Sequence, residues 1–251
     1  MRLLSTLALA ALLAAPAFSN AATPATGAKN IVLVHGAFAD GSGWRVVHDV
    51  LRLKGYNVSI VQEALTSFDD DVAATRAIVD RQDGPVVLVG HSYGGSVITV
   101  AGDAANVKAL VYVAAFEPEI GESVLQLVTR KPALSTAVRP TPDGRLSIDP
   151  DQFGADFAAD LLPNRTNFMA ASQVSVNPAA FRAKVAVAAW HDKPSYGIVA
   201  TEDRSLNPDL QRQMYQRAGA TITEIKASHA VYISQAEAVA DVIEQAALNA
   251  H

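Results

Sequence analysis

Cysteine is absent from the 251-residue sequence. Its absence excludes a cysteine nucleophile, a thiolate metal site and an iron–sulfur cluster, and it leaves the fold to be stabilised by its core rather than by disulfides. Positive charge is also scarce, since 20 Lys and Arg stand against 25 Asp and Glu, and no run of basic residues alternates with aromatic ones. We therefore expect no nucleic-acid partner.

Long apolar segments are missing after the first residues, so we expect no membrane span in the mature protein. Residues 1–21 have the pattern of a signal peptide: Arg2 at the positive end, an apolar core over residues 3–13, and small residues at the cleavage site. The apolar run is short for a bilayer, and Pro16 interrupts it. Residues 22–29 are expected to form a flexible leader, and the protein is expected to be exported to the periplasm or the medium.

Apolar runs and helical patterns alternate along residues 30–251, which we expect to form one α/β domain. The runs are continuous in valine, isoleucine and leucine, which predicts a mostly parallel sheet of about six strands with helices on both faces. The expected strands cover residues 31–35, 58–61, 86–89, 109–114, 196–201 and 221–226. The alternation breaks down over about residues 117–190, where short amphipathic pieces at 153–162 and 167–174 predict an insertion.

The segment Gly90-His91-Ser92-Tyr93-Gly94-Gly95 lies between an expected strand and a helix-like run. A serine that attacks a carbonyl has to stand clear of the backbone, and G-x-S-x-G achieves this with a sharp strand-to-helix turn. The N-terminus of the following helix also directs N–H groups at developing negative charge. Ser92 is therefore the candidate nucleophile.

A nucleophilic serine needs a base, and the base needs a carboxylate to hold its tautomer. His229 follows the last expected strand and is the candidate base. Asp203 follows the strand before it and is the candidate acid, with Glu202 and Glu117 as alternatives. The order serine, acid, histidine is the one found in α/β-hydrolases.

A tetrahedral intermediate needs two N–H donors for its oxyanion. One is expected from the backbone of Tyr93, and the other from the glycine-rich loop after the first strand, either Ala37 or Phe38. The spacing of this loop fits no phosphate-binding motif. The aspartates at 69–71 are interpreted as the acidic start of a helix. We expect neither a metal nor an organic cofactor.

Four segments, at residues 34–37, 90–95, 201–203 and 228–229, together resemble the α/β-hydrolase superfamily. The chain resembles in particular its small-lid esterase branch, which contains plant methyl esterases and hydroxynitrile lyases, and it is similar to bacterial exported hydrolases. The resemblance implies the α/β-hydrolase fold, with the insertion as a small helical lid. It also implies an esterase that cleaves small to medium carboxylic esters through an acyl-serine intermediate.

The resemblance carries roles to individual residues. It implies that Ser92, His229 and Asp203 form a catalytic triad and that the amides of Ala37 and Tyr93 form the oxyanion hole. The expected substrate pocket comprises Phe38, His35, His91 and Phe116, and further candidates, either for the pocket or for the core of the lid, are Phe153, Phe157, Phe168 and Met169. The expected partner is a small-molecule ester.

Departures from the pattern bear on neighbouring activities. Hydroxynitrile lyases carry a lysine after the histidine and a threonine in the first loop, where this chain has Ala230 and Gly36, so lyase activity is disfavoured. Haloperoxidase-like relatives often have a proline where Ala37 and Phe38 stand, which makes that chemistry less favoured. Hydrolysis of C–C bonds or lactones, perhydrolase or haloperoxidase-like chemistry, and ligand binding without catalysis stay open as alternatives.

Overall fold

Six parallel strands, formed from the apolar runs of the sequence, make up the central sheet of the computed structural model, which describes residues 27–250. The strands lie in the order β2-β1-β3-β4-β7-β8. Their bounds are Asn30–Val34 (β1), Asn57–Ile60 (β2), Val86–His91 (β3), Val107–Val113 (β4), Ser195–Ala200 (β7) and Thr221–Ile225 (β8). Because β1, β3 and β7 are buried along their whole length, their apolar runs are continuous. The predicted parallel sheet is confirmed.

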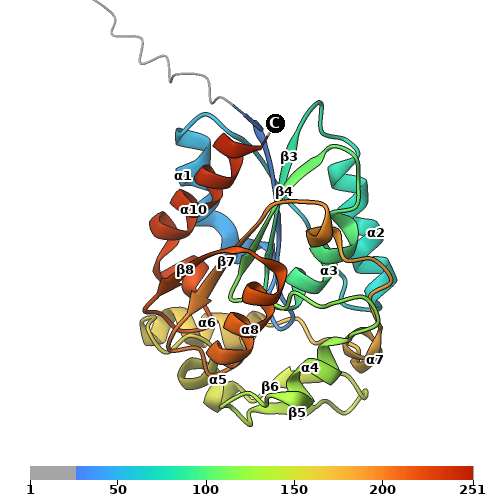
Figure 1. Cartoon of the computed structure of the whole chain (residues 1–251). Helices are drawn as coiled ribbons and strands as arrows, with labels where there is room; N and C mark the ends of the chain where they lie inside the picture. Colours follow the sequence, from blue (N-terminus) through green and yellow to red (C-terminus); the bar gives the residue numbers. More distant parts are fainter. Residues whose placement is uncertain (1–26, 251) are drawn as a thin grey trace, which may run out of the picture.

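Helices cover both faces of this sheet (Figure 1). On one face, α1 packs beside α10, with α9 and the short helix η1 next to them; on the other face, α2 packs beside α3, and α8 joins the same apolar layer. Their bounds are Gly41–Trp44 (η1), Arg45–Leu53 (α1), Phe68–Val79 (α2), Tyr93–Ala101 (α3), Pro208–Ala218 (α8), Val231–Ser234 (α9) and Ala236–Asn249 (α10). The sheet is therefore buried between two apolar layers, as the sequence predicts.

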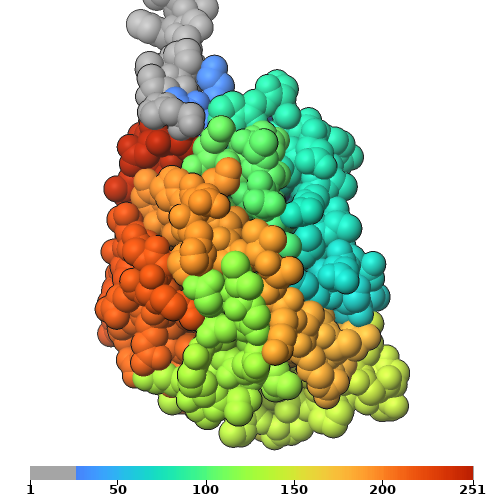
Figure 2. All heavy atoms as spheres, turned by 45° about the vertical axis from the view of Figure 1, so that its right-hand side comes forward, coloured from blue at the N-terminus to red at the C-terminus, as the bar shows by residue number. Residues whose placement is uncertain are grey.

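The segment between β4 and β7 forms the insertion, most of which lies at the lower end of the molecule in Figures 1 and 2. Its elements are Val124–Arg130 (α4), Val138–Pro140 (β5), Leu146–Ile148 (β6), Pro150–Phe157 (α5), Pro163–Ser172 (α6), Pro178–Arg182 (α7) and Ala189–His191 (η2). The helices α5 and α6 each begin three to four residues earlier than the expected pieces at 153–162 and 167–174, and both begin at a proline. Proline suits the first turn of a helix, since its fixed φ is helical and its missing N–H has no partner there.

The N-terminal prediction falls largely outside the described residues, which begin at residue 27 and so exclude the expected signal peptide. The end of the expected leader is part of the fold, because Ala28 is buried and its N–H donates to the carbonyl of Ala247 at 3.0 Å. Within residues 27–250, no helix is both long enough and apolar enough to cross a membrane.

Candidate active site

Ser92 occupies the turn between β3 and α3 with a strained backbone, at φ 53° and ψ −122°. Such a conformation costs about 1–3 kcal/mol in a residue other than glycine, and it persists only where the surroundings enforce it. The two glycines after the turn let α3 press against the neighbouring loops. A Cβ at Gly94 would lie 2.4 Å from the carbonyl oxygen of His35, and one at Gly95 would lie 2.3 Å from that of Phe116. The sequence thus folds here into the expected strand-to-helix turn.

The structure brings Ser92, His229 and Asp203 together from three separate loops. The Ser92 hydroxyl lies 2.9 Å from His229 Nε2, and His229 Nδ1 lies 2.6 Å from Asp203 Oδ2. All three side chains are buried. With the proton of the neutral imidazole on Nδ1, which donates to the carboxylate, Nε2 is free to accept the serine proton. This arrangement can transfer a proton from Ser92 to His229.

The Asp203 carboxylate is fixed by further donors. Its Oδ1 accepts the backbone N–H groups of Ser205 and Leu206, each at 2.8 Å, and its Oδ2 accepts Gln211 Nε2 at 2.9 Å. A buried carboxylate held in this way stays oriented toward the imidazole. Asp203, rather than either alternative acid, is the carboxylate in contact with His229.

The two alternative acids have other surroundings. Glu202 is exposed and lies 3.6 Å from Lys226 Nζ. Glu117 follows β4 as expected, but its buried carboxyl makes no hydrogen bond to His229, and burial raises the pKa of that carboxyl well above the usual range. Burial thus disfavours the charged carboxylate that a partner of imidazolium has to supply.

The loop after β1 lies directly against Ser92. A Cβ at Gly36 would come within 2.7 Å of Ser92 Cβ, so only glycine fits there without a shift of the chain. The next residues, Ala37 and Phe38, line the same cavity as Ser92. Tyr93 is the first residue of α3, and its N–H therefore belongs to the group that a helix leaves without an internal partner. These backbone positions suit an oxyanion formed at Ser92.

A cavity of about 270 Å³ opens beside Ser92 and His229. Most of its wall comes from the insertion, with Val124, Leu125, Val128, Ala133, Ser135, Val138, Leu146, Ile148, Phe157 and Phe181; the remaining wall residues are Ala37, Phe38, Ser92, Tyr93, Phe116, Ser205 and His229. Of the expected pocket residues, Phe38, Phe116 and Phe157 are present. Among residues 27–250, no Lys, Arg, Asp or Glu side chain belongs to this wall. The cavity suits an uncharged, apolar group.

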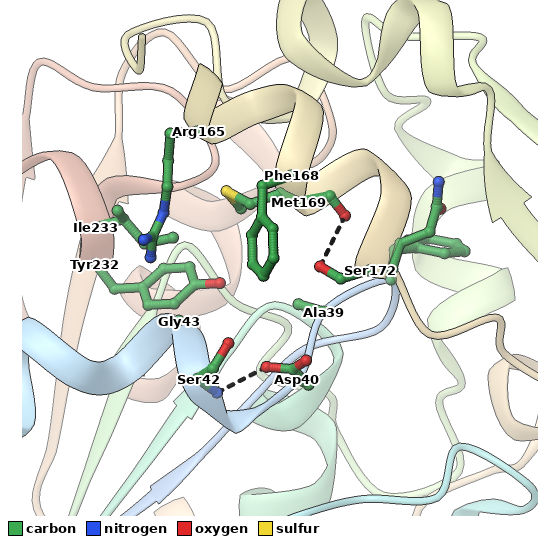
Figure 3. A pocket seen from close by; sticks show the side chains of 12 residues that line it. Ala39, Asp40, Ser42, Gly43, Arg165, Phe168, Met169, Ser172, Tyr232 and Ile233 are labelled. Carbon is green, nitrogen blue, oxygen red and sulfur yellow. Dashed lines mark hydrogen bonds between the residues drawn. The ribbon is translucent and has the colours of Figure 1, made fainter. Parts of the chain in front are cut away.

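A second hollow lies between η1 and α6 (Figure 3). Phe168 and Met169 project into it from α6, opposite Ser42 and Tyr232. Its volume is about 20 Å³, which holds roughly one water molecule. Phe168 and Met169 are thus placed at this crevice and not in the cavity beside Ser92, while Phe153 stacks on Phe157 with ring centroids 4.9 Å apart, in the core of the insertion.

His35 and His91 do not lie in the cavity wall, contrary to expectation. His35 donates from Nδ1 to the carbonyl of Gly36 at 2.9 Å and accepts the N–H of Glu63 at Nε2, also at 2.9 Å. His91 donates from Nε2 to the backbone carbonyl of His229 at 3.0 Å, and the two rings lie 4.7 Å apart. Burial lowers the pKa of both histidines, most strongly for His91. Both are therefore neutral side chains that hold the neighbouring backbone by hydrogen bonds.

The acidic run at 69–71 starts α2, as predicted. Ser67 accepts the N–H of Asp70 at 3.1 Å, which caps the helix. Asp71 turns inward and accepts the hydroxyl of Tyr93 at 2.8 Å, a contact that sequence reasoning missed. In the part of the chain that the structure describes, no group of three or more His, Asp or Glu side chains is arranged to hold a metal ion.

The serine, histidine and carboxylate at the ends of parallel strands define a hydrolase-like site. The model of the alpha/beta hydrolase family matches residues 31–242, and the chain belongs to this family. The chain is 26% identical to Methylesterase 2 of Arabidopsis thaliana over 226 residues, which cover 74% of this chain and 82% of that protein. It is 36% identical to a carbendazim hydrolyzing esterase of Nocardioides sp. (strain SG-4G), over 40% of this chain and 48% of the esterase, or about half of that relative.

Solved structures show the same fold. A pyrethroid hydrolase from Sphingobium faniae JZ-2 superposes with a TM-score of 0.73 at 22% identity, covering 87% of this chain and 96% of that one. Polyneuridine aldehyde esterase superposes with a TM-score of 0.75 at 19% identity, covering 87% and 98%. The resemblance to the methyl esterase branch of the α/β-hydrolases is confirmed.

Proposed function

We propose that this enzyme hydrolyses neutral carboxylic esters with a small to medium apolar group, through an acyl-serine intermediate. The observation that carries the proposal is the 2.9 Å contact between the Ser92 hydroxyl and His229 Nε2 at the wall of an apolar cavity. A nucleophile paired with a base, beside space for a substrate, is the arrangement that acyl transfer needs.

In the acylation step, Ser92 Oγ attacks the ester carbonyl carbon while His229 Nε2 takes the hydroxyl proton. The C–O π electrons move to the carbonyl oxygen, and the N–H groups of Ala37 and Tyr93 donate to the oxyanion. Asp203 stabilises the imidazolium that forms, since its Oδ2 lies 2.6 Å from Nδ1. The tetrahedral intermediate then expels the alcohol, which takes its proton from His229 Nε2.

Deacylation repeats the sequence with water. His229 takes a proton from water as the water oxygen attacks the acyl carbon, and the collapsing intermediate releases the acid and returns the proton to Ser92 Oγ. The products are one carboxylic acid and one alcohol. The protein's residues end in the state in which they began.

The cavity supports the proposed substrate class. Its wall is apolar except for hydroxyl groups and the imidazole, and an ionised substrate group would lose its hydration there without a charged partner. Its volume of about 270 Å³ lies just below the range of about 300–1,000 Å³ for sites of drug-sized ligands, which favours small to medium esters. Relatives named as a methylesterase and a carbendazim hydrolyzing esterase agree with an ester substrate.

The test is hydrolysis of p-nitrophenyl acetate and octanoate by the wild type and by Ser92→Ala and His229→Ala. We expect both variants to lose about a thousandfold or more in kcat. His48→Ala, a substitution in α1, is the control and is expected to keep wild-type turnover. An inert wild type, or a Ser92→Ala protein as active as the wild type, would overturn the proposal and favour a non-catalytic ligand-binding role.

We further propose that residues 1–21 direct export, on the strength of their charged, apolar and small-residue pattern. The measurement is N-terminal sequencing of the full chain expressed in a Gram-negative host, after separation of cytoplasm, periplasm and medium. A mature N-terminus near Ala22 outside the cytoplasm is the expected result. An unprocessed cytoplasmic chain would contradict it.

A further inference from the structure

A short part of the insertion contacts both loops that carry the base and the acid. This part, residues 156–160, consists of the end of α5 and the turn after it, and we name it the clamp segment. It is far in sequence from both loops, so its contacts with them are formed only in the folded protein.

The loop of His229 is held by the clamp segment on both sides of the histidine. Asp160 accepts the backbone N–H of Ser228 at 3.0 Å and also the Ser228 hydroxyl. On the other side, the N–H of Ala230 donates to the carbonyl of Phe157 at 3.0 Å. Ser228 is 3% exposed with Asp160 in place, so removal of the Asp160 carboxylate takes away the acceptor of both Ser228 donors.

The loop of Asp203 is held by Asp156, the first residue of the clamp segment. The Asp156 carboxylate accepts Arg204 Nε at 2.8 Å and forms an ion pair with it. The Asp156 carbonyl accepts the hydroxyl of Ser205, also at 2.8 Å. The residues directly after Asp203 are therefore tied to the same segment as the neighbours of His229.

We infer that Asp160 is a positioning residue, which sets the placement of His229 by holding Ser228. The inference rests on the proposed function. Asp160 is exposed and lies outside the cavity wall, so it acts without touching substrate. Without its carboxylate, the buried Ser228 donors have to find other acceptors, and the loop shifts to reach them. A shift of about 1 Å in a catalytic group costs up to about 100-fold in rate.

The test compares Asp160→Ala and Asp160→Asn with Asp151→Ala, which removes an exposed carboxylate from the first turn of α5, the helix that leads into the clamp segment. We expect kcat on p-nitrophenyl acetate to fall about 10- to 100-fold in Asp160→Ala, with KM within about twofold of the wild type. Asp160→Asn keeps one acceptor oxygen and is expected to recover part of the loss. Asp151→Ala is expected to match the wild type.

A second readout separates this inference from the proposed function. The low-field NMR signal of the His229 Nδ1 proton, which depends on the bond to Asp203, is expected to shift or broaden in Asp160→Ala and to stay unchanged in Asp151→Ala. A folded Asp160→Ala protein with an unchanged signal and wild-type kcat would overturn the positioning role. A shifted signal in a protein whose wild type hydrolyses no ester would support the positioning role and overturn only the esterase proposal.

Discussion

Replacing Asp203 by asparagine is expected to lower kcat about ten-thousandfold while the cavity stays intact. Asp203 Oδ2 accepts from His229 Nδ1 and Gln211 Nε2, and Oδ1 accepts from the backbone N–H groups of Ser205 and Leu206. An asparagine amide placed toward His229 donates to Nδ1, which moves the imidazole proton to Nε2. In that tautomer His229 has no lone pair for the proton of Ser92.

The opposite orientation of the amide is also unfavourable, since its NH₂ group then faces the two backbone N–H groups. The expected loss corresponds to about 5 kcal/mol in the activation free energy. The assay is the initial rate on p-nitrophenyl acetate, with circular dichroism and Tm to verify folding. Glu202→Gln is the matched control, because Glu202 is the exposed neighbour of Asp203. A folded Asp203→Asn protein within tenfold of the wild type, or an equal loss in Glu202→Gln, would refute the assignment.

Three other predictions follow from the described contacts. Gly94→Ala pushes a Cβ to 2.4 Å from the His35 carbonyl, so Tm should fall by several degrees more than in Gly84→Ala, where the nearest atom is 3.7 Å away; equal values would contradict this. Val128→Trp fills part of the cavity, so it should lower kcat/KM for an octanoate ester about tenfold more than for an acetate ester. The factor corresponds to about two methylene groups of the longer acyl chain that lose their place in the cavity. An unchanged preference for acyl-chain length would count against the cavity as the substrate site. Burial, and after it the charge of Asp71, raises the pKa of Glu63 in the folded protein. The stability that a protonated Glu63 gives the wild type is fully present below about pH 4.3 and is lost as the pH rises toward the folded pKa. In urea unfolding, Glu63→Gln should therefore gain stability over the wild type between about pH 5 and pH 8, and a stability difference between the two proteins that does not change with pH would argue against this.

The sheet and the nucleophile turn were predictable because their signals are local. Continuous apolar runs over four to six residues identify strands buried on both faces, and β1, β3 and β7 have that burial. Parallel strands end at one edge of the sheet, so residues after three of them were expected to meet. The choice between Glu202 and Asp203 was not local, because it depends on which carboxylate the turn after β7 directs at His229.

The insertion was the least predictable part. The hairpin of β5 and β6 has only three residues in each strand, and β5 is exposed throughout, so it carries no alternating pattern. Its stability comes from pairing within the folded insertion. Two hydrogen bonds beside the active site were equally unpredictable, the one from Ser228 to Asp160 and the one from His91 to the carbonyl of His229, because each joins residues far apart in sequence. Such contacts leave no periodic signal in either partner.

The most direct test of the central claim is covalent trapping of the nucleophile. Incubation with diethyl p-nitrophenyl phosphate, followed by peptide mass spectrometry, should give one diethylphosphoryl adduct on Ser92, in proportion to the loss of esterase activity. Modification should be slowed strongly in His229→Ala, because the base 2.9 Å from the hydroxyl is then missing. An adduct on a different residue that accompanies the loss of activity, or full turnover after Ser92 is modified, would contradict the assignment of Ser92 as nucleophile.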